Sequence, residues 1–202
     1  TTAALGLALR ARGAGKRVAI VFFDKGGEHY SERNILGQLG IDWFAYGLDR
    51  IDPETGRFRF GVIPEDITEA ERGMAKVREL ISLRRLERNE VRSRYLGRSN
   101  RGLSTRSPDS LGRDDAERKY DLLILDEINS SVALGMVSES AVEELIAAKS
   151  PELELVLTGR IEIAHGKGIR PKYFDRADLL TEMRLERHYF YTGTPAREGF
   201  DF

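Results

Sequence analysis

The chain has 202 residues, of which 41% are hydrophobic and 32% are charged, as in soluble globular proteins that bury a full core. It has no cysteine, which excludes disulfide bonds, cysteine-ligated zinc and a thiol nucleophile. A formal net charge of −1 gives no overall attraction to nucleic acid or anionic lipid. No apolar run has membrane-spanning length and no secretory segment is visible, so we expect a cytoplasmic protein.

The charge is unevenly distributed along the chain. Between Ser82 and Arg113, nine arginines stand against three acids, and residues 97–115 are rich in turn formers. We expect one nucleotide-binding domain over 1–202 with a basic, flexible insertion around 82–115. Its arginines could bind nucleic acid, but the neutral total charge and the scarcity of interleaved aromatics favour a solvated helix or a partner contact.

Strands and helices alternate along the rest of the chain. In the first half we expect a helix over 1–12, a strand over 17–23, a helix over 31–38, a strand over 41–46, an irregular or hairpin stretch to about 64 and a helix over 66–96. In the second half we expect a strand over 120–125, a helix over 138–148 that begins at Ser138, a strand over 153–158, a short helix before 176, a strand over 178–183 and an irregular tail. This order predicts an α/β fold with a mostly parallel sheet flanked by helices.

The most informative run is the apolar segment that ends in Asp126 and Glu127. A short apolar run indicates a strand buried on both faces, and ligands bind at the carboxyl end of such strands. Because an unpaired buried aspartate is costly, we expect a cation or a hydrogen-bonding ligand nearby. The pattern is typical of a Walker B strand, whose carboxylate holds Mg²⁺. An ordinary strand followed by an acidic helix cap is the alternative.

The first predicted helix opens on Thr1 and Thr2. In a P-loop, the glycine-rich turn and its lysine come directly before a Ser/Thr that binds Mg²⁺ and begins a helix. We therefore interpret Thr1 as the end of a Walker A motif whose glycine-rich part would precede residue 1. A threonine-capped helix is the alternative. The Gly-Ala-Gly-Lys run at 13–16 is not itself a P-loop, because Arg17 stands where Ser/Thr is needed and a strand follows.

Six short segments occur in the same order as in the P-loop-type corrinoid adenosyltransferases, which the chain resembles over roughly 1–47 and 118–202. They are TTAALG at 1–6, FDKGG at 23–27, LDEIN at 125–129, VLTGR at 156–160, ADLLTEMR at 177–184 and AREGFDF at 196–202. The second and the last are close to the usual F-x-K-G-G and A-x-x-G-I-E-F/Y of that family.

The resemblance implies a P-loop NTPase (RecA-like) architecture and an enzyme that transfers the 5′-deoxyadenosyl group of ATP to the cobalt(I) of a corrinoid. Triphosphate is released, in adenosylcobalamin synthesis or salvage. The resemblance also implies Mg²⁺ or Mn²⁺, cob(I)alamin or another reduced corrinoid as substrate, a reductase or flavoprotein as electron donor, and a homodimer. Cobalt(I) brings its own nucleophilicity, so the protein has only to bind triphosphate and aim C5′ of the ribose.

On this interpretation Thr1 supplies a hydroxyl to the metal and Thr2 a hydrogen bond to phosphate. Asp126 and Glu127, the expected catalytic pair, hold or orient the metal from the facing strand. Lys25 could reach phosphate from its turn.

Two further positions follow strands in the same way. The glycine at Gly26 lets backbone N–H groups approach an anion, and the guanidinium of Arg160 suits phosphate oxygens. A plain turn at 25–26 and a surface salt bridge at Arg160 are the alternatives.

Family members carry a phenylalanine-x-tryptophan element that contacts the corrin, and the nearest candidate here is Phe58-Arg59-Phe60. Phe58 and Phe60 lie on one face of an extended segment. We expect them to form an apolar wedge under the corrin, with a buried strand as the alternative.

A P-loop ATPase that hydrolyses ATP, with Glu127 orienting water, is the competing function. A nucleic-acid-binding ATPase that uses the arginine-rich insertion is a third.

Overall fold

The computed structural model describes residues 1–52, 54–82, 120–161, 170–195, 197 and 199–200. Within these residues the centre is a four-stranded sheet of order β2-β1-β3-β4, and every neighbouring pair is parallel. Its strands are β1 (Val18–Phe23), β2 (Asp42–Tyr46), β3 (Leu122–Asp126) and β4 (Glu154–Leu157). The predicted α/β fold with a parallel sheet flanked by helices is confirmed.

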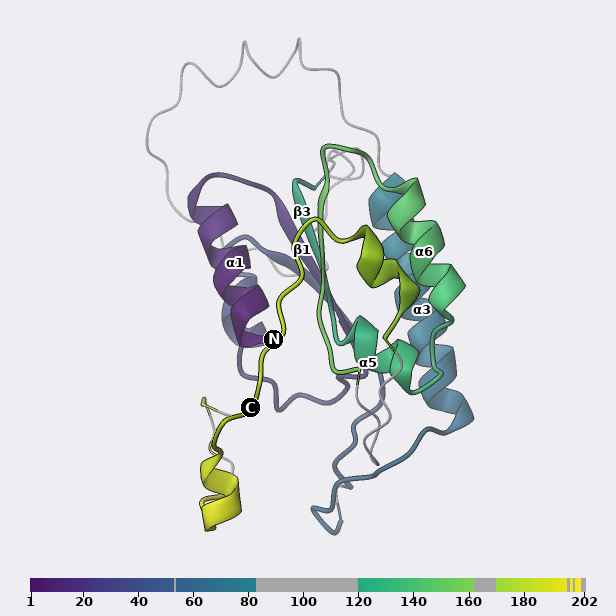
Figure 1. Cartoon of the computed structure of the whole chain (residues 1–202). Helices are drawn as coiled ribbons and strands as arrows, with labels where there is room; N and C mark the ends of the chain where they lie inside the picture. The colour runs from purple at the N-terminus through teal and green to yellow at the C-terminus, as the bar shows by residue number, and fades with distance from the viewer. Residues whose placement is uncertain (53, 83–119, 162–169, 196, 198, 201–202) are drawn as a thin grey trace.

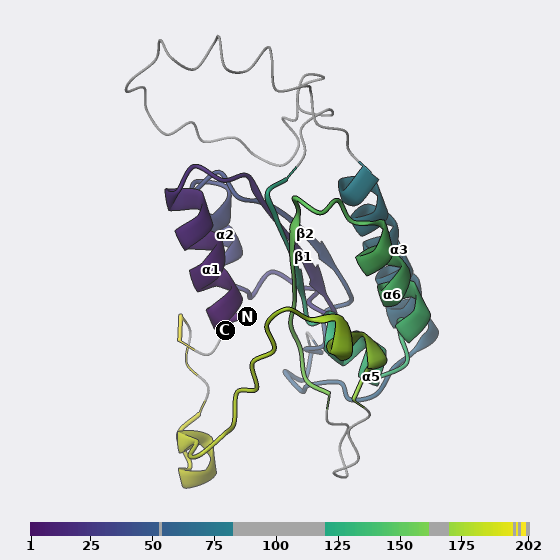
Figure 2. The ribbon, with the colours of Figure 1, turned by 45° about the horizontal axis from the view of Figure 1, so that its top comes forward.

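Helices cover both faces of the sheet (Figures 1 and 2). One face carries α1 (Thr2–Gly13) and α2 (Arg33–Leu36), and the other carries α3 (Pro64–Ser82), α5 (Ile128–Ala133) and α6 (Glu139–Ala148). After β4 the described residues contain the 3₁₀ helices η3 (Lys172–Arg176) and η4 (Tyr189–Thr192). No helix among the described residues is long and apolar enough to span a bilayer.

The two central strands are buried along their whole length. Successive side chains of β1 alternate between the two faces, so Val18, Ile20 and Phe22 pack with α1 and α2, while the residues between them pack with α3 and α6. The register sets Phe22 opposite Asp126. The carboxyl ends of β1 and β3 therefore meet at one edge of the sheet.

Most expected elements lie within two residues of their observed bounds. The stretch before α3 contains the expected hairpin, where Ile51 and Phe58 form an antiparallel bridge. The predicted helix over 66–96 begins at Pro64 and is described to Ser82; its continuation and the basic insertion lie outside the described residues. Ser138 caps α6 by accepting a hydrogen bond from the backbone N–H of Ala141 at 3.2 Å.

Two expectations differ from the structure. The predicted strand over 178–183 is wrong: these residues pair with no strand in the described part of the chain, and Leu179 and Met183 are 84% and 82% exposed. An apolar pattern shows only that a segment suits a pleated surface, and tertiary pairing decides whether it joins a sheet. The short helix α5, which the sequence analysis did not predict, contains asparagine, two serines and valine, which are weak helix formers.

Gly73 of α3 lies directly against Phe23 of β1. A Cβ at position 73 would stand 2.7 Å from a ring carbon of Phe23, whose side chain is fully buried, so the ring or the helix would have to shift. Gly6 of α1 is a matched control, because a Cβ there meets nothing within 4 Å. Both positions gain the same helix propensity when changed to alanine. The difference in unfolding free energy between the two variants therefore measures the steric clash with Phe23.

We predict that Gly73→Ala is less stable than Gly6→Ala by about 1–3 kcal/mol, the usual cost of overpacking a core. Urea unfolding of both variants and the wild type measures the difference. Equal stabilities would show that the α3–β1 packing adjusts without cost.

Candidate functional site

Polar side chains from four separate segments meet at the carboxyl edge of the sheet. Asp126 ends β3, Lys25 follows β1, Thr158 follows β4 and Thr1 precedes α1. This edge is the usual ligand-binding position of parallel α/β folds, because every strand ends there.

Asp126 is the centre of this cluster. It is 1% exposed, and Thr1 donates its hydroxyl to Oδ2 at 2.9 Å. The ammonium of Lys25 lies 2.7 Å from the same oxygen and also donates to the hydroxyl of Thr1. Thr158 donates its hydroxyl to Oδ1 at 2.7 Å. Both carboxylate oxygens therefore have hydrogen-bond donors, which offset the cost of burying the charge.

Two opposing effects act on the pKa of Asp126. Burial raises it, but the attraction of Lys25 and the hydrogen bonds from Lys25 and Thr158 outweigh burial and bring the pKa below its ordinary value. The carboxylate is therefore ionised at neutral pH.

The oxygens of Asp126 and Thr1 are hard donors that suit Mg²⁺ or Mn²⁺. Within the described residues no three His, Cys, Asp or Glu side chains form a metal cage. This donor set fits a magnesium ion that takes its remaining ligands from water and phosphate, as is usual for that metal.

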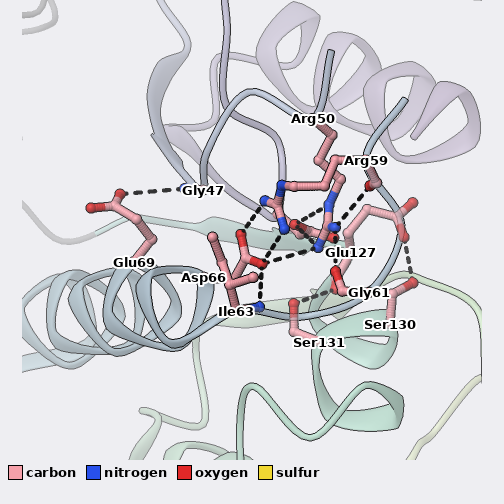
Figure 3. A network of polar contacts seen from close by, with 11 residues as sticks. Gly47, Arg50, Arg59, Gly61, Ile63, Asp66, Glu69, Glu127, Ser130 and Ser131 are labelled. Carbon is pink, nitrogen blue, oxygen red and sulfur yellow. Dashed lines mark hydrogen bonds and ion pairs between the residues drawn. The ribbon is translucent and has the colours of Figure 1, made fainter. Parts of the chain in front are cut away.

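Glu127 lies beside the cluster, but its side chain turns toward α5 (Figure 3). Its carboxylate accepts a hydrogen bond from the hydroxyl of Ser130 at 2.5 Å. Its carbonyl accepts from both the backbone N–H and the hydroxyl of Ser131, each at 3.0 Å. Glu127 has a φ of 63°, a left-handed conformation that is uncommon for a residue with a side chain. The structure thus brings Asp126 and Thr1 together and directs Glu127 to one side.

Thr158 is a member of the site that the sequence analysis did not select. Besides donating to Asp126, its hydroxyl accepts the backbone N–H of Glu127 at 3.1 Å, so it fixes the end of the acidic strand. The following Gly159 has a φ of 127°, and a Cβ there would lie 2.7 Å from the backbone nitrogen of Ser130. The sequence signal for Thr158 is its place in the VLTGR segment, directly after a predicted strand whose carboxyl end lies at the same edge of the sheet.

The turn at Lys25 is held in place from two sides. Arg33 donates to the carbonyls of Lys25 and Gly27, the latter at 2.9 Å, and its guanidinium lies 4.5 Å from the centre of the Tyr30 ring. A Cβ on Gly26 would stand 2.2 Å from the carbonyl carbon of Leu48. Close packing against the loop after β2 therefore requires glycine at position 26. This packing is a reason for the glycine that does not depend on the binding of an anion.

The remaining predicted residues lie outside the cluster. Thr2 is the exposed first residue of α1, and Arg160 is exposed after β4, with its backbone N–H donating to the hydroxyl of Ser130 at 2.8 Å. Phe58 and Phe60 are 53% and 85% exposed, and their rings meet edge to face with centroids 5.0 Å apart. The alternative of a buried strand at these phenylalanines is wrong.

The parallel sheet, with a buried aspartate at the end of β3 facing the threonine that opens α1, defines a P-loop NTPase-like fold. A family model described as ATP:corrinoid adenosyltransferase BtuR/CobO/CobP matches residues 1–88 and 109–202, and the chain belongs to this family.

Several relatives are similar along the whole chain. The corrinoid adenosyltransferase of Escherichia coli strain K12 is 26% identical over 202 residues, which are all of this chain and 79% of that protein. The corrinoid adenosyltransferase CobA of Salmonella typhimurium strain LT2 is 25% identical over 203 residues, again 79% of its length. An uncharacterized protein of Nostoc sp. strain PCC 7120 is 26% identical over 214 residues, and the chain spans only 45% of it.

The Lys25–Asp126 pair generates a prediction on stability and pH. The lowered pKa of Asp126 contributes stability that is fully present above the unfolded pKa, about 3.9. That contribution is lost as the pH falls through the lower pKa of the folded state. We predict that Lys25→Met lowers the free energy of unfolding by roughly 3 kcal/mol at pH 7, the lower end for breaking a buried ion pair, because two threonines still donate to Asp126.

The loss in Lys25→Met should shrink as the pH is lowered toward full protonation of Asp126. Urea unfolding between pH 3 and pH 7 measures it, with the exposed Lys16→Met as the control for a lost surface charge. A loss of the same size at every pH would contradict the assignment to Asp126.

Proposed function

We propose that the protein transfers the 5′-deoxyadenosyl group of ATP to the cobalt(I) of a corrinoid and releases triphosphate. The electron pair of cobalt(I) attacks C5′ of the ribose, a cobalt–carbon bond forms, and the C5′–O bond breaks with its electron pair leaving on triphosphate. The supporting observation is the cluster of Thr1, Lys25 and Asp126, which offers a hydroxyl, an ammonium and a carboxylate at one sheet edge.

Each member of the cluster has a proposed task. Thr1 and Asp126 would hold Mg²⁺ or Mn²⁺, which supplies positive charge to the triphosphate when bound. Lys25 neutralises Asp126 in the free protein and turns to a phosphate oxygen when the metal–nucleotide complex brings its own charge. Thr2, at the first turn of α1, donates to phosphate, and Arg160 reaches phosphate from the end of β4.

We assign Glu127 an orienting role. Its carboxylate accepts a hydrogen bond from Ser130 and does not occupy the centre of the cluster. We assign it the task of positioning a water molecule or the ligands of the metal. Lys25 stands in the same turn as Gly26, which packs tightly against Leu48, and in the free protein this turn holds the ammonium of Lys25 beside Thr1.

Phe58 and Phe60 are the proposed corrinoid contact. They form an exposed aromatic pair on the hairpin between β2 and α3, and apolar surface of this kind can shield the lower face of a corrin from water. Cobalt is easier to reduce when no water molecule binds it from the lower face of the corrin, and the aromatic pair would keep water away from that face. A reductase or flavoprotein would deliver the electron, and a cytoplasmic homodimer fits the family resemblance.

Product analysis tests the proposed reaction directly. Anaerobic incubation of the protein with Mg-ATP and reduced cobalamin should yield triphosphate and change the visible spectrum as the cobalt–carbon bond forms. The native protein, with any residues that precede Thr1, should be used. ADP and phosphate in place of triphosphate would identify hydrolysis at the γ-phosphate and overturn the proposal.

A second prediction concerns the aromatic pair. Replacing Phe58 and Phe60 together by alanine should lower kcat/KM for the corrinoid on the order of 100-fold, because the substrate is no longer held in line with C5′. The Kd of ATP should change by less than about twofold. Ile35→Ala removes another half-exposed apolar side chain, on α2, and serves as control. Equal losses for both substrates would refute the corrinoid contact.

A further inference from the structure

The loop after β2 contains a buried guanidinium that the proposed reaction has not used. Arg50 is 9% exposed. Its Nε donates to Oδ1 of Asp24 at 2.8 Å, and its Nη2 lies 2.7 Å from the same oxygen. Its Nη1 donates to the carbonyls of Gly61 at 2.7 Å and Arg59 at 3.3 Å. One side chain thus joins the residue after β1 to the hairpin before α3. Figure 3 shows Arg50 together with Arg59, Gly61 and Asp66.

A second arginine fastens the same hairpin to α3. Arg59 donates to both carboxylate oxygens of Asp66, at 2.9 and 2.7 Å, in a bidentate geometry. Asp66 is 2% exposed, and it also accepts the backbone N–H of Ile63 at 3.0 Å. Nη2 of Arg50 lies 3.8 Å from Asp66, so the two arginines and the two aspartates form one connected group.

The position of these bonds determines what they control. The two carbonyls that Arg50 holds belong to the residues on either side of Phe60, which is itself 85% exposed. Holding the carbonyls on both sides fixes the backbone from which Phe60 projects, and among the aromatic contacts of the described residues the ring of Phe60 itself meets only Phe58. At its other end Arg50 holds Asp24, which has a left-handed φ of 52° and directly precedes Lys25.

Stability alone is a weak explanation for this arrangement. Buried ion pairs are often no more stable than apolar residues of the same volume, because desolvating the charges is costly. Burial raises the pKa of Asp24 even though Arg50 opposes the shift, so the desolvation of this carboxylate outweighs the attraction of its partner. What an arginine adds over an apolar residue is a directed set of donors that fixes two backbone carbonyls and one carboxylate.

We propose that Arg50 is a positioning residue that sets the Phe58–Phe60 pair relative to the Lys25 turn. On the proposed function, which this inference rests on, it thereby sets the distance and angle between the corrinoid and the ribose carbon of ATP. It touches neither substrate. Its contribution is to alignment, and misalignment by about 1 Å is enough to slow a reaction on the order of 100-fold.

The test compares Arg50→Met, Arg50→Lys and a control, Arg57→Met, whose side chain is exposed on the same hairpin. Hydrogen–deuterium exchange of the amides over 58–62 reports the placement of the hairpin, whether or not the protein is active. For Arg50→Met we expect exchange there to rise on the order of tenfold, while exchange of β3 stays as in the wild type.

Kinetics on the same variants then test the link to the reaction. Arg50→Met should lower kcat on the order of 100-fold and raise the KM of the corrinoid, while the Kd of ATP stays within about twofold. Arg50→Lys keeps the charge and most of the volume but loses the fork, so it should fold and give an intermediate kcat. Arg57→Met should match the wild type in every measurement.

Three results would overturn the inference. They are unchanged exchange over 58–62 in Arg50→Met, a parallel loss of ATP affinity and kcat, and an Arg50→Lys variant as poor as Arg50→Met. If the wild type forms no cobalt–carbon bond, the proposed function fails, and the exchange measurement by itself decides whether Arg50 places the hairpin.

Discussion

The need to compensate one buried negative charge organises this structure. Asp126 ends a strand that is buried along its whole length, and the residue is only 1% exposed. Three donors from three distant segments meet it, Thr1, Lys25 and Thr158. Because each donor stands within two residues of a regular element, satisfying one carboxylate also fixes the start of α1 relative to the ends of β1, β3 and β4.

At the carboxyl edge of the sheet, the ends of the strands hold the polar side chains of the cluster in place. Thr158 bridges Asp126 and Glu127, and Gly159 allows β4 to end in contact with the first turn of α5. On the far side, Arg50 extends the arrangement to the hairpin that carries Phe60. The polar cluster and the exposed aromatic pair are thus parts of one connected framework, joined through residues 24 and 25.

Much of the fold could be predicted, because in the strands the pattern of apolar residues along the sequence agrees with their burial in the sheet. The apolar runs at 18–23 and 122–126 are long enough to indicate buried strands, and their carboxyl ends must then lie together. The contacts of Arg50 could not be predicted, since they join residues far apart along the chain through a hairpin of irregular shape. The same holds for Glu127, whose left-handed backbone turns it toward Ser130, and for 178–183, which pair with no strand among the residues that the structure describes.

The ionised state of Asp126 has a consequence for the order in which ligands assemble. In the free protein the ionised carboxylate is paired with the ammonium of Lys25, so a bare triphosphate or a bare divalent cation would separate that pair and leave one charge unmatched, whereas metal and triphosphate together supply a cation for Asp126 and an anion for Lys25. On the proposed function, metal and nucleotide therefore raise each other's affinity, and thermodynamic linkage requires the two enhancements to be equal. A protein built on this edge would discriminate between free and metal-chelated nucleotide before any chemistry begins.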